Sequence, residues 1–438
     1  MTFDRRTFVK TAVAATPFFA DRVLGANDRP NTAFIGMGKM GRSNLSVAMK
    51  QENLQVTHVC DIFARNLNWA ADMAKKKFPE TKSVKDFREI LADKSIDVVC
   101  IATPDHWHPY MMVEAAKAGK DVYVEKPICV TVEEGKKMVE AARKYKRVVQ
   151  AGTQQRSGDH FIQAAKLVRD GELGQVTRVT TWNIGNSPVE GIGTPPDEEP
   201  PADFDWDMWQ GPAPKRPYNK NRVGIDPDDK YFSNFRWFWD YAGGMMTDWG
   251  IHLLDIVQMA YNEQMPKSIT AFGEKFRLKD NRETPDTIIA MYEYPGFLAT
   301  YENRYGNGNN LSGKGYGITF HGDKGTLFVD RSMYQLWDEK RGAEPVTVKS
   351  GNNQNMAHWA NFLECVKTRN KPNADIEICQ RSTTTCLLAN VALRSKLRLD
   401  WDEQKWTVKQ PEARKYLPRR TQTLEAGCLV LKQSFSRS

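Results

Sequence analysis

A carboxylate and an imidazole four residues apart are the first side chains in this sequence whose types and spacing fit catalysis. Asp248 and His252 lie in the glycine-containing segment from Gly243 to Asp255. If the chain is helical from about Met246, the two side chains emerge one turn apart on one face. A carboxylate beside an imidazole orients the ring and raises its basicity, which provides an acid/base for interconverting an alcohol and a carbonyl near neutral pH. Taken alone, such a pair is more often a structural ion pair.

Lys126 is the third candidate, because it ends an apolar, β-branched run. The residues Val122-Tyr123-Val124-Glu125-Lys126-Pro127 predict the end of a strand, since a residue that precedes proline is pushed out of the helical region. Parallel α/β sheets bind ligands at the carboxyl ends of their strands, so a lysine there can project into a site. An exposed lysine in a turn is the alternative that this stretch leaves open.

A glycine turn after the first predicted strand indicates where a nucleotide binds. Asn31 to Ile35 is a short apolar strand that runs into Gly36-Met37-Gly38-Lys39-Met40-Gly41 and then into a helical stretch. In this context G-x-G-x-x-G predicts dinucleotide binding, because its glycines allow a tight turn, approach of the pyrophosphate and close packing of helix on strand. A second strand, Gln55 to Cys60, ends in Asp61, whose carboxylate can accept hydrogen bonds from the adenosine ribose and favours NAD. Arg65, one turn later, is suited to the 2′-phosphate of NADP, so both cofactors stay open.

Three further apolar strands are predicted in the first half of the chain, at 96 to 102, 121 to 125 and 148 to 152. The first of them delivers the loop Thr103-Pro104-Asp105-His106-Trp107-His108-Pro109. Histidine is a common metal ligand, but His106 and His108 alone do not make a metal site. We therefore expect a nucleotide at this strand end and no metal.

After Gly152 the pattern changes to a helix, Asp159 to Arg169, followed by runs of strands. Strands without alternating helices predict an α+β second domain with a mainly antiparallel sheet. The stretch from Pro188 to Tyr231 is expected to be a long wrapping loop. Two amphipathic helices follow near the end, and His358 at the start of the first is expected to reach the cleft. The predicted strands of this half are 176 to 182, 268 to 276, 287 to 294, 297 to 303, 316 to 320 and 326 to 330.

The N-terminus is similar to a twin-arginine export signal. Asp4-Arg5-Arg6-Thr7-Phe8-Val9-Lys10 precedes a modestly apolar segment of small residues, Thr11 to Ala20. We expect residues 1 to 26 to lie outside the folded domains and the protein to be periplasmic or otherwise exported through the twin-arginine route. A basic segment without a targeting role is the alternative.

Composition excludes several classes of protein. The 438 residues carry a net charge of +8, from 62 Lys and Arg against 54 Asp and Glu, and the basic residues are scattered. Nucleic acid binding is therefore not expected. No apolar run approaches the roughly 20 residues that a membrane span needs. The seven cysteines show no C-x-x-C spacing and are odd in number, so they argue neither for a disulfide framework nor for a zinc site.

Together, the glycine turn, Glu125-Lys126-Pro127 and the segment from Gly243 to His252 resemble the Gfo/Idh/MocA family of glucose-fructose oxidoreductases, inositol dehydrogenases and rhizopine-catabolism proteins, over roughly residues 30 to 420. The resemblance implies an α/β fold: a Rossmann domain, 30 to 152, and a C-terminal α+β domain, 153 to 412. The large, mainly antiparallel open sheet of the second domain would mediate homo-oligomers. Residues 413 to 438, including Cys428, are expected to form a poorly ordered tail.

The resemblance also implies roles for the candidate residues. Hydride would pass between a sugar, glycoside or cyclitol hydroxyl and a bound NAD, or NADP. Lys126 would contact the substrate hydroxyl and the nicotinamide ribose, and Asp248 and His252 would bind substrate, with His252 as the acid/base. The residues implied to bind the cofactor are Gly36, Met37, Gly38, Lys39, Met40, Gly41, Asp61, Thr103, Pro104, His108, Glu125 and Lys126, with no metal ligand among them.

Two other functions stay open. The NAD-dependent glycosidase branch of the family has what looks like a Tyr-Pro-Thr-His-Gly motif at the place where this chain has Thr247-Asp248-Trp249-Gly250-Ile251-His252. This difference argues against a glycosidase without excluding it. A non-catalytic sugar sensor would keep both fold and cofactor. The aromatic run from Phe235 to Tyr241 suits stacking on a pyranose, but such clusters are more often core.

Overall fold

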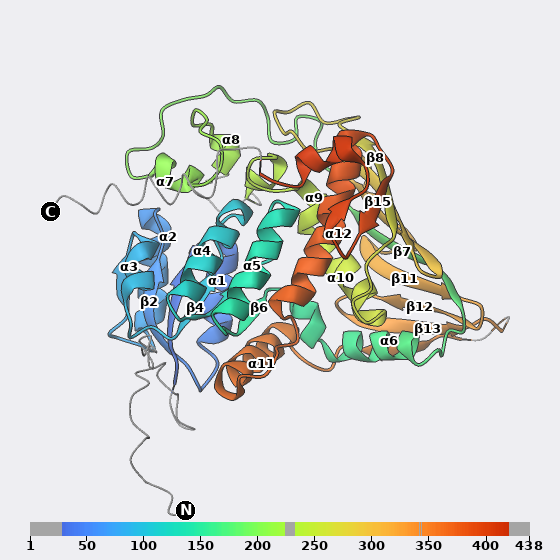
Figure 1. Ribbon diagram of the computed structural model, residues 1–438, viewed down its shortest axis with the longest axis horizontal. Coiled ribbons are helices and arrows are strands. Elements are labelled where there is room, and N and C mark those ends of the chain that lie inside the picture. Colours follow the sequence, from blue (N-terminus) through green and yellow to red (C-terminus); the bar gives the residue numbers. More distant parts are fainter. Residues whose placement is uncertain (1–28, 224–232, 341, 343, 420–438) are drawn as a thin grey trace, which may run out of the picture.

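The computed structural model describes residues 29–223, 233–340, 342 and 344–419. The predicted export signal and Cys428 lie outside these ranges. The described chain forms two sheets that lie side by side, each with its own helices (Figure 1). Within these ranges no helix combines the length and the apolar character that crossing a membrane requires.

The N-terminal domain is built on a six-stranded parallel sheet. Its strands are β1 (Asn31–Ile35), β2 (Gln55–Cys60), β3 (Lys82–Val84), β4 (Val98–Ile101), β5 (Asp121–Val124) and β6 (Val149–Ala151). They lie in the order β3-β2-β1-β4-β5-β6, so the direction of winding reverses between β1 and β4. Doubly wound sheets bind ligands at such a switch point. The predicted Rossmann domain is confirmed.

Helices cover both faces of this sheet, which explains why its strands are almost wholly apolar. Alternate residues of β1 point to opposite faces: Ala33 and Ile35 belong to one hydrophobic cluster, and Phe34 belongs to another. The first cluster includes residues of α3 (Phe87–Ala92), α4 (His108–Lys117) and α5 (Val132–Lys144), and the second includes residues of α1 (Lys39–Ala48) and α2 (Ala64–Lys75).

One helix on this sheet comes from the far end of the sequence. In α11 (Gln354–Thr368), the ring of Trp359 stacks on Tyr123 of β5, with centroids 4.6 Å apart and an interplanar angle of 9°. Its indole Nε1 donates to Oδ1 of Asn44 in α1 at 3.1 Å. Phe362 is buried in the same cluster. The boundary expected after residue 152 therefore does not separate the two cores, because α11 completes the first.

The second domain contains a ten-stranded sheet. The strands are β7 (Val176–Ile184), β8 (Ser268–Glu274), β9 (Thr287–Tyr294), β10 (Phe297–Arg304), β11 (Tyr316–Gly322), β12 (Gly325–Val329), β13 (Met333–Asp338), β14 (Val346–Lys349), β15 (Leu399–Asp402) and β16 (Thr407–Val408). They lie in the order β14-β13-β12-β11-β7-β10-β9-β8-β15-β16. Only the β7–β10 pair is parallel, so the expectation of a mainly antiparallel sheet is confirmed. The strands from β13 onward were not predicted.

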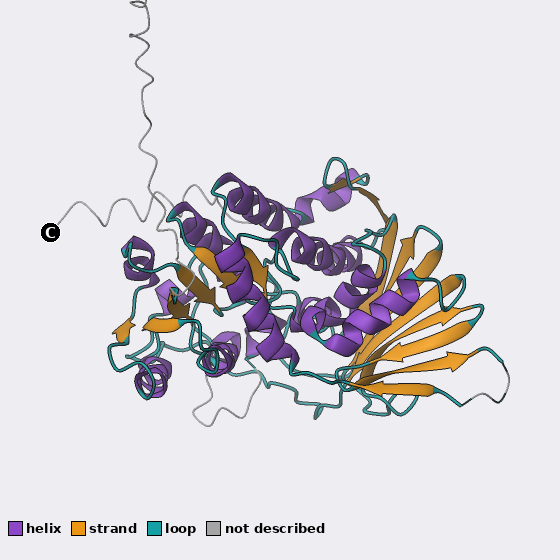
Figure 2. Ribbon diagram, turned by 90° about the horizontal axis from the view of Figure 1, so that it is seen from below, coloured by secondary structure: helices purple, strands orange, loops and turns teal. Residues whose placement is uncertain are grey.

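Helices pack on only one face of the larger sheet (Figure 2). They are α6 (Asp159–Arg169), α10 (Gly250–Ala260) and α12 (Ile376–Ser395). The alternation along β9 shows the asymmetry, since Ile288, Ala290 and Tyr292 are buried while Ile289 and Met291 are 50% and 44% exposed. None of the described helices covers the other face, in agreement with the expectation of an open sheet.

The segment after β7 folds over the carboxyl ends of the Rossmann strands (Figure 1). Its described part contains two short helices, α7 (Trp206–Gln210) and α8 (Lys220–Val223). Phe204, Trp209 and Tyr218 from this segment pack with Trp237, Phe238 and Tyr241 in a third hydrophobic cluster. The aromatic run is thus mainly core.

The expectation of a poorly ordered tail from residue 413 is wrong for residues 413–419. The 3₁₀ helix η4 (Pro411–Tyr416) buries Ala413, and Leu417 is buried beside it. Arg419 Nε donates to Oε1 of Glu134 in α5 at 2.6 Å. Burial of these two apolar side chains and the buried ion pair hold the segment in place. Residues 420–438 lie outside the described ranges.

Candidate active site

The glycine turn between β1 and α1 forms the floor of a cleft. Gly36 has φ +85°, and a β-carbon there would lie 2.7 Å from the backbone N of Thr103. A β-carbon at Gly41 would lie 1.8 Å from the carbonyl oxygen of Gly36. At Gly38 a β-carbon would meet nothing within 4 Å. Packing therefore requires the first and third glycines, whereas Gly38 leaves open space at the start of α1, where backbone N–H groups favour an anion such as a pyrophosphate.

The cleft above this turn has a volume of about 280 Å³. Two of the predicted residues do not line it: the side chain of Met37 is buried in the core, and Gly41 packs against Gly36. The others do, namely Gly36, Gly38, Lys39, Met40, Asp61, Thr103, Pro104, His108, Glu125 and Lys126. The residues present fit a dinucleotide.

Asp61 stands at the end of β2 and fixes the turn. Its Oδ2 accepts a hydrogen bond from the N–H of Met37 at 2.7 Å, and its Oδ1 accepts one from the N–H of Phe63 at 2.8 Å. Burial raises the pKa of this carboxyl, and the two backbone N–H donors oppose that shift. Oδ2 also accepts a long hydrogen bond from Nδ2 of Asn66 at 3.4 Å, whereas Oδ1 can accept a second hydrogen bond, so Asp61 can still bind a ribose hydroxyl. Arg65 also lines the cleft.

The two histidines after β4 are held by backbone carbonyls. The ring nitrogens of His108 lie 2.8 Å from the carbonyl oxygen of Pro127 and 2.7 Å from that of Thr103, joining the loops after β4 and β5. Burial lowers the pKa of His108 to about 4. His106 Nε2 lies 2.9 Å from the carbonyl oxygen of Trp209. Across the described ranges no three His, Cys, Asp or Glu side chains are grouped to hold a metal ion.

His358 does not reach the cleft, and that expectation is wrong. Its Nδ1 lies 2.8 Å from Oγ of Ser157, and its Nε2 lies 2.9 Å from the carbonyl oxygen of Ala151. Because α11 packs on the Rossmann sheet, the ring is fully buried at the end of β6.

A second cavity of about 300 Å³ adjoins the cleft. Lys126, Met40 and Arg236 line both spaces, so the tip of β5 stands at their border. Asp248 and His252 line the second cavity. The structure thus gathers the three predicted catalytic residues around one space.

Within this cavity Asp248 is bound by two cations. Its Oδ1 lies 3.0 Å from Lys126 Nζ and 3.1 Å from Arg236 Nη2. Burial opposes ionisation of this carboxyl, but the charges of Arg236 and Lys126 hold its pKa below the usual value. Asp248 is therefore a carboxylate that links the tip of β5 to the second domain.

Asp248 does not orient His252 as expected, since no hydrogen bond joins their side chains in the described structure. The helix is interrupted at Trp249: Asp248 ends α9 (Gly244–Asp248), and His252 lies in α10. Two nearby cations attract the carboxylate more strongly than a neutral imidazole does.

Gln155 and Trp249 fix the position of His252. Its carbonyl oxygen accepts a hydrogen bond from Gln155 Nε2 at 2.9 Å, and its ring packs edge-on against Trp249 with centroids 5.9 Å apart. Burial lowers the pKa of His252 well below its usual value, and the charges of Lys126 and Arg331 lower it further. The ring is therefore neutral near pH 7 and can accept a proton.

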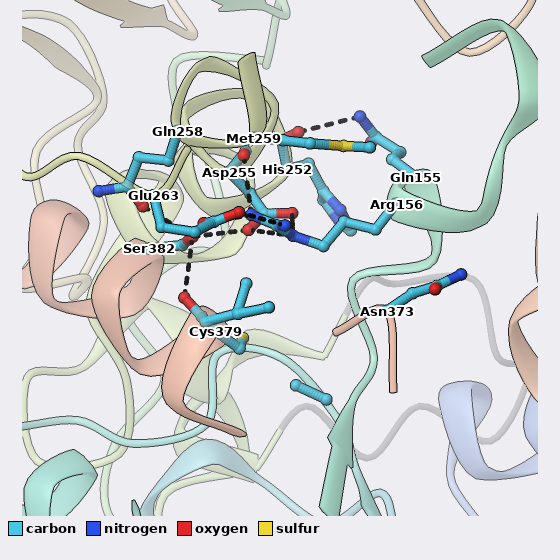
Figure 3. Close-up of polar contacts among 12 residues, drawn as sticks. Gln155, Arg156, His252, Asp255, Gln258, Met259, Glu263, Asn373, Cys379 and Ser382 are labelled. Atoms are coloured by element: carbon cyan, nitrogen blue, oxygen red, sulfur yellow. Dashed lines mark hydrogen bonds and ion pairs between the residues drawn. The ribbon is translucent and has the colours of Figure 1, made fainter. Parts of the chain in front are cut away.

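Behind His252 lies a buried polar network (Figure 3). Arg156 Nε donates to both oxygens of Asp255 at 2.9 and 2.8 Å, and its terminal nitrogens each lie 2.8 Å from Glu263. Ser382 Oγ of α12 donates to Asp255 Oδ1 at 2.6 Å. Because Asp255 lies one turn after His252, the network fixes α10 against the 3₁₀ helix η2 (Gln154–Ser157).

Three site residues were missed by the sequence analysis: Arg236, Gln155 and Arg331. A single arginine within the aromatic run from Phe235 to Trp239 is a signal, because a charge in a buried run needs a partner. Gln155 follows β6 as Lys126 follows β5, and the carboxyl end of a parallel strand is again a signal. Arg331 lies in a turn after β12 without any local pattern.

Two family models match the chain. Residues 31–153 match the model GFO_IDH_MocA, described as the oxidoreductase family with an NAD-binding Rossmann fold. Residues 162–423 match the model GFO_IDH_MocA_C2, described as the C-terminal alpha/beta domain of the oxidoreductase family.

Individual relatives are more distant. Inositol 2-dehydrogenase of Salmonella typhimurium is 32% identical over 163 residues, which are 37% of this chain and 48% of that protein. A glycosyl hydrolase family 109 protein of Shewanella baltica is 28% identical over 175 residues, 38% of each chain. The chain thus matches less than half the length of these curated relatives. The solved structure of aldose-aldose oxidoreductase from Caulobacter crescentus superposes with a TM-score of 0.65 at 22% identity, over 85% of this chain and 99% of that one, and supports the fold.

Proposed function

The chain belongs to the Gfo/Idh/MocA family of NAD-binding oxidoreductases, and from this premise we propose that it transfers hydride between a carbohydrate hydroxyl and NAD. The observation that carries the proposal is the position of Lys126. Its ammonium lies at the border between the nucleotide cleft and the second cavity, and Asp248 holds it there at 3.0 Å. A substrate in the second cavity would have its hydroxyl beside this ammonium and beside the cofactor.

The residues around the second cavity have different roles in the proposed reaction. Neutral His252 takes the proton of the substrate hydroxyl. The C–H bond on the carbon that bears this hydroxyl breaks at the same time and its hydrogen leaves as hydride, so the alcohol becomes a carbonyl. Lys126 stabilises the negative charge that develops on the oxygen. Arg236 keeps Asp248 ionised, and Asp248 orients the ammonium of Lys126. When bound, NAD supplies the acceptor for the hydride.

We propose NAD in preference to NADP. Asp61 lines the cleft at the end of β2, where its carboxylate can bind ribose hydroxyls and repels a 2′-phosphate.

A glycosidase that oxidises its substrate transiently is the second candidate. The similarity to the Shewanella protein favours it, and the same residues can serve both reactions, since each begins with removal of a hydroxyl proton and hydride. The difference is the outcome: the glycosidase eliminates the aglycone and returns the hydride, so NAD is unchanged overall.

Mass spectrometry of nucleotide released from the purified protein, followed by incubation with chromogenic glycosides, tests these proposals. Net formation of NADH without release of the aglycone supports the oxidoreductase. Release of the aglycone at constant NADH supports the glycosidase. A protein that neither carries nor binds a nicotinamide nucleotide contradicts both. A ligand response that survives substitution of Lys126 and His252 without any turnover indicates a sensor.

We also propose that the open sheet face forms a homo-oligomer. Phe272 of β8 pairs with Ile289 of β9 in the sheet register, and their side chains are 77% and 50% exposed. Met291 and Leu298 are exposed on neighbouring strands. A contiguous apolar surface of this kind is typical of an interface between subunits.

The protein is proposed to be exported in folded form to the periplasm. Support comes from Arg5-Arg6 and the small-residue segment that follows them. Folding before export would allow NAD to be bound in the cytoplasm.

A further inference from the structure

We propose that the substrate carries a carboxylate that binds to the guanidinium of Arg331 in the second cavity. This inference rests on the proposed function, because it names the class of sugar, an acidic one, on which the enzyme acts.

The side chain of Arg331 is held at its Nε, whereas its terminal nitrogens have no partner among the described residues. Its Nε donates to Oε1 of Gln155 at 3.2 Å, and its guanidinium carbon lies 4.9 Å from the centre of the Trp249 ring. Its two terminal nitrogens make no hydrogen bond or ion pair with any residue in the described ranges. Arg331 lines the second cavity, so this end faces the space that holds the substrate.

The charges around the cavity leave Arg331 without a counterion. Lys126, Arg236 and Arg331 line it, and Asp248 is the single carboxylate among its described lining residues. Asp248 is bound by the first two cations. The neighbouring Asp330 is turned away, since its carboxylate accepts hydrogen bonds from Ser332 and lies 3.4 Å from Lys314. A half-buried guanidinium without a counterion is costly, and an acidic ligand would remove that cost.

The geometry of the two terminal nitrogens of Arg331 favours a carboxylate as the ligand. With Nε occupied by Gln155, the guanidinium presents Nη1 and Nη2 side by side, which matches the two oxygens of a carboxylate in a bidentate pair. The position of the guanidinium over the Trp249 ring, 4.9 Å from its centroid, restrains this fork. A sugar hydroxyl cannot neutralise the charge.

The distance between this cation and His252 is set by one side chain. Gln155 accepts from Arg331 Nε and donates from its own Nε2 to the carbonyl oxygen of His252 at 2.9 Å. Gln155 is in turn fixed because the adjacent Arg156 is paired with Asp255 and Glu263 (Figure 3). The carboxylate and the reacting hydroxyl would therefore bind at fixed separation on one rigid support.

Binding of matched glycosides to the NAD-loaded protein tests the inference. The probes are methyl β-D-glucuronide and methyl β-D-galacturonide against methyl β-D-glucoside and methyl β-D-galactoside, measured by calorimetry at low and high salt. At least one uronide should bind tenfold or more tightly than its neutral partner, and salt should reduce the difference. In Arg331→Gln the difference between acidic and neutral glycosides should vanish, and in the control Arg88→Gln it should persist.

Several results would overturn the inference. They are equal binding of acidic and neutral partners, no uronide binding at all, or a preference that survives Arg331→Gln. Tighter binding of glucose 6-phosphate than of either uronide would exclude a carboxylate as the recognised group. Turnover of neutral glycosides alone refutes the acidic substrate and leaves the oxidoreductase standing, whereas absence of bound nicotinamide nucleotide refutes the oxidoreductase itself.

Discussion

Lys126 Nζ lies 3.0 Å from Oδ1 of Asp248 and 3.0 Å from the carbonyl oxygen of the same residue. These two residues are 122 positions apart in the sequence and belong to different domains. The tip of β5 is thereby joined to the end of α9, and the nucleotide cleft is joined to the second cavity. A single charged pair thus sets where hydride transfer would take place.

Substitution of Lys126 should lower turnover far more than it lowers the affinity for the cofactor. In Lys126→Ala the developing oxyanion loses its charged neighbour, and we expect kcat to fall by about 10²- to 10⁴-fold. The affinity for NAD, measured by fluorescence titration, should change little because the glycine turn and Asp61 are intact. Lys117→Ala, an exposed lysine at the end of α4, should behave as wild type. Retention of a tenth or more of the turnover by Lys126→Ala would refute this role.

The two glycines that begin the turn should respond differently to alanine. Gly38→Ala places its methyl group in open space, so the midpoint of thermal unfolding should stay the same while NAD binds about tenfold or more weakly. Gly36→Ala, with φ +85° and backbone atoms 2.7 to 2.8 Å from the new carbon, should destabilise the fold by at least 1–2 kcal/mol, roughly the cost of a left-handed residue. Calorimetric unfolding and NAD titration separate the two effects. Unchanged NAD affinity in Gly38→Ala would argue against the assigned pyrophosphate position.

Asp105 should make the protein less stable as the pH rises. Burial in the cleft raises its pKa to about 8, and the charge of Asp248 adds to the shift against Arg236 and Lys126. Between about pH 4, where the unfolded carboxyl titrates, and pH 8, the folded state holds a proton that the unfolded state releases. The stabilisation is complete below this window and is lost as pH increases through it.

Urea unfolding at pH 5, 6.5 and 8 measures this effect. Asp105→Asn carries no titrating proton, so its free energy of unfolding relative to wild type should rise with pH. The exposed carboxylate of Asp207 supplies the control, and Asp207→Asn should run parallel to wild type. If the curves for Asp105→Asn and wild type are parallel, Asp105 is not protonated in the folded protein.

A charge on the open sheet face should separate the subunits. Ile289→Lys places an ammonium among Phe272, Met291 and Leu298, and light scattering should show the mass of a monomer. Because Ile289 is already half exposed, the fold itself should tolerate the change. Ile162→Lys is the matched control, since this exposed isoleucine lies on α6. A wild-type protein that is itself monomeric at micromolar concentration would contradict the proposal.

Conservative replacement of the arginine pair should stop export. Arg5→Lys with Arg6→Lys keeps the charge but removes the guanidinium groups that the twin-arginine route recognises. Cell fractionation and immunoblotting should then find the uncleaved chain in the cytoplasm. Arg22→Lys, in the same segment, should leave export unchanged. Equal periplasmic amounts of the double variant and wild type would show that the pair is not a signal.

The parts of the fold governed by local rules were predictable from sequence. β1, the glycine turn and Asp61 were found because strand, turn and helix follow one another within about thirty residues and each has its own residue signature. The antiparallel sheet was predicted because its strands alternate in hydrophobicity. The strands β13 to β16 were not predicted, because the sequence of β13, Met-Tyr-Gln-Leu-Trp-Asp, does not alternate and β14, β15 and β16, with four, four and two residues, are too short to establish a period.

The site was predictable only in its parts. The spacing of Asp248 and His252 suggested a pair, but a carboxylate chooses its partner by charge and distance in space. Lys126 and Arg236 supply two cations from elsewhere in the chain. Arg331 depends on Gln155 and Trp249, and no local pattern reports such contacts across long sequence separations.

The placement of α11 has a consequence for the order in which the protein matures during translation. All six Rossmann strands have been synthesised once residue 151 emerges, yet the face that carries Phe34 and Tyr123 is covered only in part, by α1 and α2, until Trp359 and Phe362 follow. The nascent first domain must therefore wait for most of the chain before its core closes. Completion of the first core is then a late event in biosynthesis, because it requires a helix that begins at residue 354.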